Sequence, residues 1–233
     1  MVRRAAGEAL GTAFLLMAVV GSGIMGERLA GSNIAIALLA NTLATGAALV
    51  TLILALQPIS GAHFNPAVTL AIAFEGGMPW HEVPLYLGTQ VGGAFGGVGA
   101  AHLMFGLPLF FASRHVRSGS AQCFSEFIAT FGLLFVIMAC SRTRPSTVPW
   151  AVGTYITAAY WFTASTSFAN PVVTIARAAS NTFAGIRPND VFGFVAAQFA
   201  GAASATLLAR WLVPAHGPKS AVSPESGRII DSG

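Results

Sequence analysis

The fold is decided by the stretch Ser60-Gly61-Ala62-His63-Phe64-Asn65-Pro66-Ala67-Val68-Thr69, whose pattern returns in Ser167-Phe168-Ala169-Asn170-Pro171-Val172-Val173-Thr174. Each stretch places an asparagine directly before a proline. Asparagine is a favoured N-cap, and proline is tolerated at the first helical position because its missing N–H would have no partner there. Each stretch therefore predicts the start of a helix.

Both predicted helices are short. Apolar residues continue only over residues 68–74 and 172–179, whereas a transmembrane helix needs about 20 residues. A half-length helix exposes backbone N–H groups that hydrocarbon cannot satisfy, so it is tolerated where it lines a wet cavity. An ordinary turn explains either Asn-Pro pair alone. The same order in two halves favours paired half-helices that meet at a transport site near the membrane midplane.

The composition places the chain in a membrane. Of the 233 residues, 55% are hydrophobic and 9% are charged, against about 25% charged in soluble proteins. The apolar run behind the short basic head continues past Val20, so we expect a retained first span and no cleaved signal. Because the basic residues are spread over loops and ends, the net charge of +4 does not predict nucleic-acid binding.

Six long apolar segments predict six transmembrane helices, at residues 6–25, 34–56, 83–105, 124–140, 148–168 and 191–213. Three spans per half invert the second half relative to the first, so the two Asn-Pro loops enter from opposite faces. The fold class is an all-α membrane protein with six spans, two re-entrant half-helices and an inverted repeat. We expect a first half at 1–118 with its loop at 58–77, a second half at 119–213 with its loop at 166–186, and a mobile tail at 214–233.

The basic residues favour cytoplasmic N- and C-termini in a multi-pass protein of the plasma membrane. In this orientation seven basic residues are inside and four are outside. The inner group is Arg3, Arg4, Arg142, Arg144, Arg210, Lys219 and Arg228, and the outer group is Arg28, Arg114, Arg117 and Arg187.

From about Glu8 to about Pro214 the chain resembles the aquaporin and aquaglyceroporin family of major intrinsic proteins. The first stretch matches the family motif almost letter for letter, and the second has Val172 in place of alanine. The resemblance implies a passive channel in a homotetramer, with water, small neutral solutes and membrane lipid as partners and no cofactor. It also implies that the amides of Asn65 and Asn170 face one another at the midplane. The motif residues are Asn65, Pro66, Ala67, Asn170, Pro171 and Val172.

Two glutamates mark the repeat again. Glu8 precedes Thr12 by four residues, and Glu126 precedes Thr130 by four residues. A carboxylate within a span normally faces protein or water. The resemblance implies that both glutamates accept hydrogen bonds from the re-entrant loops, although Glu8 could instead lie at the interface and end a helix. We expect His63 to brace the first loop or line the inner mouth, because no second metal ligand is near it in sequence.

The resemblance implies a selectivity constriction built from four positions, Thr45, Ala158, Ser167 and Val173. Val173 stands where the family usually has arginine, and Thr45 stands where many members have an aromatic residue. A small gap in the fifth span would replace Ala158 by Tyr160 or Trp161. These changes remove bulk and charge, so they predict a wider filter without arginine.

The wider filter predicts passage of small uncharged solutes, such as glycerol-like polyols and the neutral hydroxide of trivalent arsenic. The bacterial aquaglyceroporin branch associated with arsenic resistance is similar in lacking the filter arginine. The alternative is mainly a water channel with incidental solute leak. Arg177 lies one turn beyond Val173 and either leans back into the outer vestibule or braces a loop.

Other classes of function find less support in the sequence. An intramembrane enzyme needs a nucleophile with a base, or a metal set, within the spans. His102 stands alone in the third span, and Cys123 and Cys140 lie near opposite ends of one predicted helix. A purely structural membrane protein predicts no open path. We therefore predict a channel, not an enzyme, without a bound metal.

Overall fold

The computed structural model describes residues 1–213, and within them every regular element is helical. Six helices are long and two are short, which confirms the predicted all-α architecture of six spans and two half-helices. The helices are α1 (Val2–Leu29), α2 (Ile34–Ser60), α3 (Pro66–Phe74), α4 (Val83–Met104), α5 (Ser120–Thr143), α6 (Val148–Phe162), α7 (Pro171–Arg177) and α8 (Val191–Leu212). Single turns of 3-10 helix, η1 (Trp80–Glu82), η2 (Pro145–Thr147) and η3 (Pro188–Asp190), precede α4, α6 and α8. The predicted tail at 214–233 lies outside the described residues.

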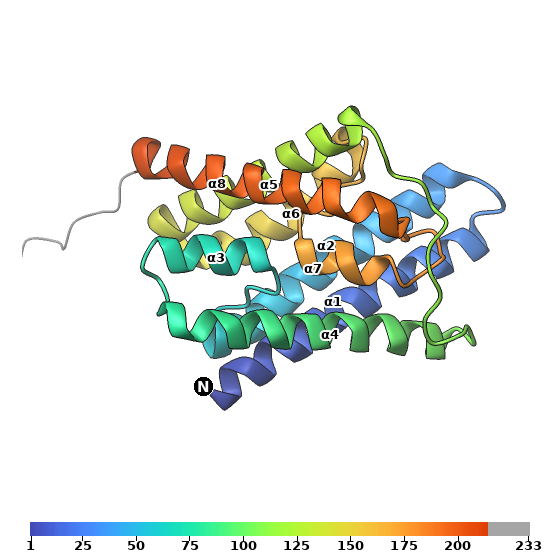
Figure 1. The fold of residues 1–233 in the computed structure, drawn as a ribbon, viewed down its shortest axis with the longest axis horizontal. Helices are drawn as coiled ribbons and strands as arrows, with labels where there is room; N and C mark the ends of the chain where they lie inside the picture. The colour runs from blue at the N-terminus through green and yellow to red at the C-terminus, as the bar shows by residue number, and fades with distance from the viewer. Residues whose placement is uncertain (214–233) are drawn as a thin grey trace, which may run out of the picture.

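The half-helices occupy the middle of the bundle. In Figure 1 the long helices run along the length of the molecule, while α3 and α7 come from opposite ends and point their first residues at each other. In the first half α1 packs against α2 and α4, and in the second α5 packs against α6 and α8. Helices α2 and α6 join the halves. Each half-helix also touches the last long helix of the other half, α3 on α8 and α7 on α4.

Most spans begin or end within a few residues of the prediction, and the fifth differs most. Within residues 1–213, four segments are both long and apolar enough to cross a membrane, namely α1, α2, α5 and Pro188–Leu212. The fifth predicted span was too long, because α6 ends at Phe162 and not at residue 168. Thr166, Ser167 and Ala169 have positive φ angles, which an α-helix does not allow, so these residues belong to the second re-entrant loop.

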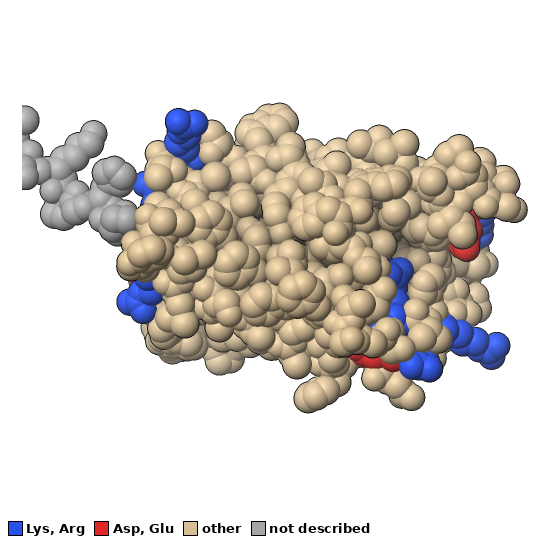
Figure 2. All heavy atoms as spheres, turned by 90° about the horizontal axis from the view of Figure 1, so that it is seen from above, with Lys and Arg blue, Asp and Glu red and all other residues tan. Residues whose placement is uncertain are grey.

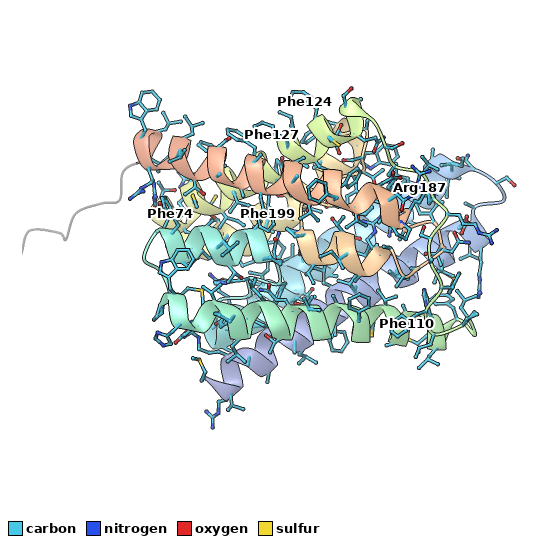
Figure 3. The ribbon with its side chains drawn as sticks, in the orientation of Figure 1. Phe74, Phe110, Phe124, Phe127, Arg187 and Phe199 are labelled. Carbon is cyan, nitrogen blue, oxygen red and sulfur yellow. The ribbon has the colours of Figure 1, made fainter. Side chains whose placement is uncertain are left out.

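The outside of the bundle suits lipid. On the face seen in Figure 2 the charged side chains lie toward the two ends, and the broad region between them is uncharged. Large apolar side chains are exposed on the bundle. Phe74 and Phe124, both labelled in Figure 3, are 52% and 64% exposed.

Close helix approach depends on glycine at corresponding places of the two halves. A Cβ on Gly93 of α4 would lie 2.3 Å from the carbonyl oxygen of Ala9 on α1. A Cβ on Gly201 of α8 would lie 2.4 Å from the carbonyl oxygen of Phe127 on α5. The first and last long helices of each half can therefore touch backbone to backbone, as small residues permit in membrane proteins.

Candidate functional site: a cavity between two half-helices

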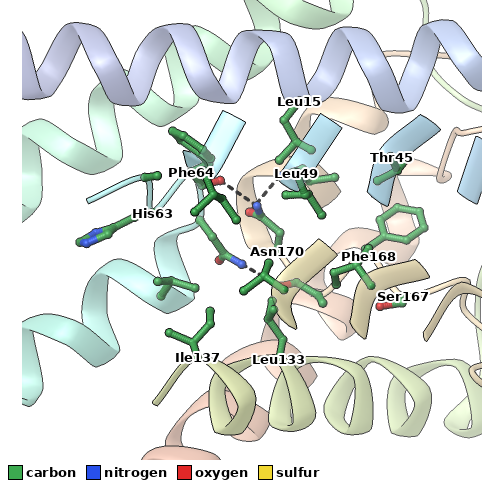
Figure 4. A pocket seen from close by; sticks show the side chains of 18 of the residues that line it. Leu15, Thr45, Leu49, His63, Phe64, Leu133, Ile137, Ser167, Phe168 and Asn170 are labelled. Carbon is green, nitrogen blue, oxygen red and sulfur yellow. Dashed lines mark hydrogen bonds between the residues drawn. The ribbon is translucent and has the colours of Figure 1, made fainter. Parts of the chain in front are cut away.

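One cavity of about 370 Å³ passes between the half-helices. It extends from Gln57 and Ser141, near the end where α2 and α5 finish, to Tyr160 and Arg177, toward the opposite end. Much of its wall is aliphatic and comes from the long helices, whereas the two re-entrant loops contribute most of the polar groups (Figure 4). The aliphatic lining residues are Leu15, Val19, Leu49, Ile53, Val68, Ile72, Leu133, Ile137, Val148, Val152, Ile156 and Val173.

The two motif asparagines cap the half-helices, as their sequence predicts. The side-chain oxygen of Asn65 accepts from the N–H of Ala67 at 2.9 Å, and that of Asn170 accepts from the N–H of Val172 at 3.1 Å. Each proline occupies the first turn of its helix, where its missing N–H costs no hydrogen bond. The caps fix the orientation of both side-chain amides.

The asparagines also join the two helix tips. The amide nitrogen of Asn65 donates to the carbonyl oxygen of Ala169, and that of Asn170 donates to the carbonyl oxygen of Phe64, both at 2.8 Å. The dashed lines in Figure 4 mark this contact. A side-chain amide carries two N–H donors, so each asparagine keeps one N–H beyond this bond. Both asparagines line the cavity, where the second N–H is available to a solute oxygen.

Both re-entrant loops carry the same unusual backbone. Ala62 and Phe64 have φ angles of 54° and 49°, and their counterparts Ser167 and Ala169 have 49° and 48°. The left-handed region costs a residue with a Cβ about 1–2 kcal/mol. Such strain persists only where the surroundings hold it, and it is concentrated at functional sites.

The two buried glutamates hold the loops. Glu8 accepts from the backbone N–H groups of His63 and Phe64 at 2.9 and 2.8 Å, and Glu126 accepts from those of Phe168 and Ala169, both at 2.9 Å. Both glutamates are fully buried within the bundle. Glu8 therefore braces the first loop and does not lie at an interface.

The same contacts orient the loop carbonyl groups. In a trans peptide the carbonyl group points opposite to the N–H of the next residue. Because the N–H groups face the glutamates, the carbonyl groups of Ala62, His63, Ser167 and Phe168 face away from them. All four residues line the cavity, which therefore offers acceptors on both sides of the asparagine donors.

A glutamine also bonds to each buried glutamate. We call each glutamate, with the loop N–H groups and the glutamine that donate to it, a clamp. Gln90 on α4 donates to Glu8 at 2.8 Å and to the hydroxyl oxygen of Thr69 at 3.0 Å. Gln198 on α8 donates to Glu126 at 2.6 Å and, at 2.8 Å, to the hydroxyl oxygen of the threonine four residues after Asn170. Neither glutamine was predicted from the sequence. The signal in the sequence was a single glutamine inside the third span of each half.

His63 both braces and lines the site. Its Nδ1 lies 3.1 Å from the hydroxyl oxygen of Thr69, and its ring centroid lies 5.2 Å from that of Tyr86. The ring borders the cavity on the side of Gln57 (Figure 4). His63 therefore contacts the first half-helix and also borders the cavity.

Of the four predicted filter residues, the structure brings three together. Thr45, Ser167 and Val173 line the cavity. Ala158 does not line it, because it is exposed on the outside of α6. Tyr160 takes its place and donates to the hydroxyl oxygen of Thr45 at 3.3 Å.

The periodicity of α6 explains the correction. The lining residues Val152, Ile156 and Tyr160 are spaced by four and share one face of the helix, whereas Ala158 points away from that face. Trp161 is half exposed and is not among the residues of the cavity wall. Tyr160 therefore makes this part of the cavity wall bulkier than alanine would make it.

Comparison with known proteins fits this geometry. The model of the family described as "Major intrinsic protein" matches residues 1–147. Over 227 residues the chain is 53% identical to the "Aquaglyceroporin AqpS" of Rhizobium meliloti (strain 1021), covering 97% of both chains. The chain belongs to the major intrinsic protein family. It is therefore a membrane channel for small neutral solutes and not an enzyme.

Two further relatives of this major intrinsic protein are more distant. It is 36% identical over 132 residues to "Aquaporin NIP1-3" of Oryza sativa subsp. japonica, which covers 56% of this chain and 45% of that one. The X-ray structure of the aquaglyceroporin from Plasmodium falciparum superposes with a TM-score of 0.72 at 23% identity. That match covers 89% of this chain and 95% of the other, and it confirms the fold.

At the end of the channel cavity opposite His63, Arg177 is 2% exposed and lines the wall. Its Nε donates to the carbonyl oxygen of Ala184, and its guanidinium carbon lies 3.3 Å from the ring centroid of Phe168. Arg177 therefore braces the loop after α7 and borders the cavity, which combines the two alternatives drawn from the sequence.

A second buried arginine of the channel, Arg117, comes from the segment between the halves. Its Nε donates to the carbonyl oxygen of Gly185 at 2.8 Å, and its Nη1 donates to that of Ser165 at 3.1 Å. Its guanidinium carbon lies 5.0 Å from the ring centroid of Phe168. From the sequence, Arg117 was predicted only to lie outside the membrane.

Titratable groups near this end of the channel respond to the arginines. Burial and the charges of Arg117 and Arg177 lower the pKa of His115, so its imidazole is neutral at pH 7. Asp190 accepts from the side chain of Arg187 at 2.7 Å and from the backbone N–H of Arg117 at 2.8 Å. Asp190 is therefore already bonded to its arginine neighbours.

Proposed function

We propose that this channel conducts small uncharged solutes larger than water across the plasma membrane, passively. The solutes are glycerol-like polyols and the neutral hydroxide of trivalent arsenic, and water and related metalloids accompany them. The observation that carries this proposal is Val173, an aliphatic residue on the cavity wall where the family usually has arginine. The relative named an aquaglyceroporin, at 53% identity, supports the same solute class.

The cavity wall matches the shape of a polyol. One part is aliphatic, and the other offers the loop carbonyl oxygens and the amides of Asn65 and Asn170. A polyol presents hydroxyl groups on one edge and C–H groups on the other, so both parts of the wall find a partner. Trivalent arsenic hydroxide also carries three hydroxyl groups on a small body, which supports its inclusion.

Cations are disfavoured along this route. No acidic side chain is among the residues that line the cavity. The first residues of α3 and α7 meet at its centre, and a helix N-terminus carries a positive partial charge. This potential opposes cations and reorients a water chain, which hinders proton transfer. Neutral solutes remain as the favoured cargo.

A second candidate function is a channel mainly for water, with incidental solute leak. Tyr160 favours it, because this bulky side chain replaces alanine on one wall and reaches Thr45. The two candidates differ in the ratio of glycerol to water flux.

We propose that both termini are cytoplasmic and that four copies assemble, with one cavity per subunit. Arg4 near the start of α1 pairs with Glu82, and Arg142 and Arg210 both pair with Glu75 at the end of α3. These basic residues gather at one end of the bundle, which supports the positive-inside orientation. Membrane lipid would then cover the rest of the apolar surface.

The test is solute flux in liposomes that carry the purified protein. Stopped-flow light scattering measures how fast the liposomes reswell in a glycerol or arsenite gradient and shrink in an impermeant osmolyte. The solute proposal predicts reswelling several-fold faster than in empty liposomes, without an ion gradient. Fast shrinkage with reswelling no faster than in empty liposomes would favour the water channel instead.

A further inference from the structure

The outer end of the cavity holds two buried cations without a carboxylate partner. The guanidinium groups of Arg177 and Arg117 lie 3.3 and 5.0 Å from the same Phe168 ring. The four ion pairs within residues 1–213 use other arginines, namely Arg4, Arg142, Arg187 and Arg210. A buried charge without an opposite charge is costly, so this arrangement calls for a ligand or a function.

Arg177 keeps donors free on the cavity side. A guanidinium has five N–H donors, and the bond to Ala184 uses the one on Nε. In the described part of the chain the two terminal nitrogens make no hydrogen bond, and they are absent from the polar atoms shut away from solvent without a partner. Because Arg177 borders the cavity, these donors reach its water.

Within residues 1–213 no carboxylate forms an ion pair with either guanidinium group, although the negative charge of Glu126 acts on both. Both side-chain oxygens of Glu126 accept hydrogen bonds, from two N–H groups of the second loop and from Gln198. Asp190 is bonded to Arg187 and to the backbone of Arg117. Arg177 is therefore the charged side chain that this end of the cavity presents to a solute, because neither carboxylate lines the cavity.

We propose that the outer mouth is a binding subsite for a small monovalent oxyanion, held by the free N–H donors of Arg177 and attracted by Arg117, which lies against the same Phe168 ring. A guanidinium binds carboxylate, sulfonate or phosphonate oxygens through two parallel hydrogen bonds. The inner part of the cavity is lined largely by aliphatic residues, where an anion would lose its hydration without a matching cation. The anion therefore stays at the mouth and obstructs the path of neutral solutes.

This subsite rests on the proposed solute function in one respect. The experiment detects a bound anion by the slower flux of a neutral solute. The probe is methanesulfonate, a monoanion that does not titrate near neutral pH and is similar in size to glycerol. It replaces chloride at constant ionic strength on both sides of the liposome membrane. The matched variants are Arg177→Gln, Arg177→Lys and Arg114→Gln, the last at an exposed arginine of the same end of the bundle.

The subsite predicts that methanesulfonate at millimolar concentration slows glycerol flux at least about twofold in the unmodified channel, as a site with millimolar Kd would. Arg177→Gln abolishes the slowing, Arg177→Lys retains part of it, and Arg114→Gln leaves it unchanged. Glycerol flux of each variant without methanesulfonate shows that the variant is folded.

Three results would overturn the subsite. They are glycerol flux that methanesulfonate does not change, inhibition that survives in Arg177→Gln, and inhibition that Arg114→Gln reduces as much as Arg177→Gln does. If the unmodified channel gives no glycerol flux at all, the solute assignment fails. Inhibition by methanesulfonate is then measured on water flux instead. The two failures are therefore distinguishable.

Discussion

The two re-entrant loops share one scaffold but differ in what surrounds it. Each has an asparagine cap, left-handed residues one and three positions before the asparagine, and a glutamate that accepts from two consecutive N–H groups. Two residues before the asparagine, however, the first loop has His63 beside Tyr86, and the second has Phe168 between arginines and Phe194. The repeat builds the passage, and the side chains around it distinguish the two mouths.

The proposed filter, with Val173 where the family usually has arginine, makes the two halves more alike. Val68 and Val173 each lie three residues after a motif asparagine, and both line the cavity. A fixed charge at the second of these positions would make the constriction asymmetric. In this chain the arginine that distinguishes the second half is Arg177, one helical turn after Val173.

Breaking a clamp should have the largest effect. Glu126→Gln leaves at least one loop N–H without an acceptor, at a cost of about 1–3 kcal/mol for each such group. We expect a lower unfolding temperature in detergent and a loss of most glycerol flux. Glu8→Gln should be at least as damaging, because Glu8 also accepts from Ser60.

The control for the clamp is Glu27→Gln, at an exposed glutamate near the end of α1. It should change neither the unfolding temperature nor the flux. If Glu126→Gln behaves like this control, the glutamates do not hold the loops.

Restoring the filter arginine should have the next largest effect. Val173→Arg places a guanidinium in the constriction one turn from Arg177, so it narrows the passage and breaks the symmetry with Val68. We expect glycerol flux to fall about tenfold, equivalent to about 1.4 kcal/mol in the barrier, and water flux to fall less. Liposome reswelling and shrinkage measure both rates, and Val173→Leu is the control for size. An unchanged ratio of glycerol to water flux would show that this position does not select.

The smallest effect should come from the contact between Tyr160 and Thr45. Tyr160→Phe removes one hydrogen bond of 3.3 Å and keeps the ring, so we expect a change of about twofold or less in solute flux. Tyr155→Phe is the matched control, because this tyrosine of α6 bonds to backbone carbonyl oxygens of α5 away from the cavity. A tenfold change in Tyr160→Phe alone would mean that this contact gates the channel.

The sequence predicted what local patterns encode. The Asn-Pro caps and their repetition in both halves follow from adjacent residues. The prediction of Ala158 was wrong, because an apolar span does not reveal which face of α6 lines the cavity, or that α6 ends at Phe162 before a loop with three left-handed residues. Arg117 was missed because its partners are 48 and 68 residues away, where no spacing rule reaches.

The most direct measurement compares glycerol flux in two variants, one with a tryptophan that points into the cavity and one with a tryptophan that points away from it. Val173→Trp fills the cavity between the half-helix and the long helices, whereas Ala158→Trp adds the same bulk on the exposed side of α6. The account predicts that Val173→Trp lowers flux to that of empty liposomes and that Ala158→Trp keeps the unmodified rate. Full flux in Val173→Trp, or a block caused by Ala158→Trp alone, would contradict a path between the two half-helices.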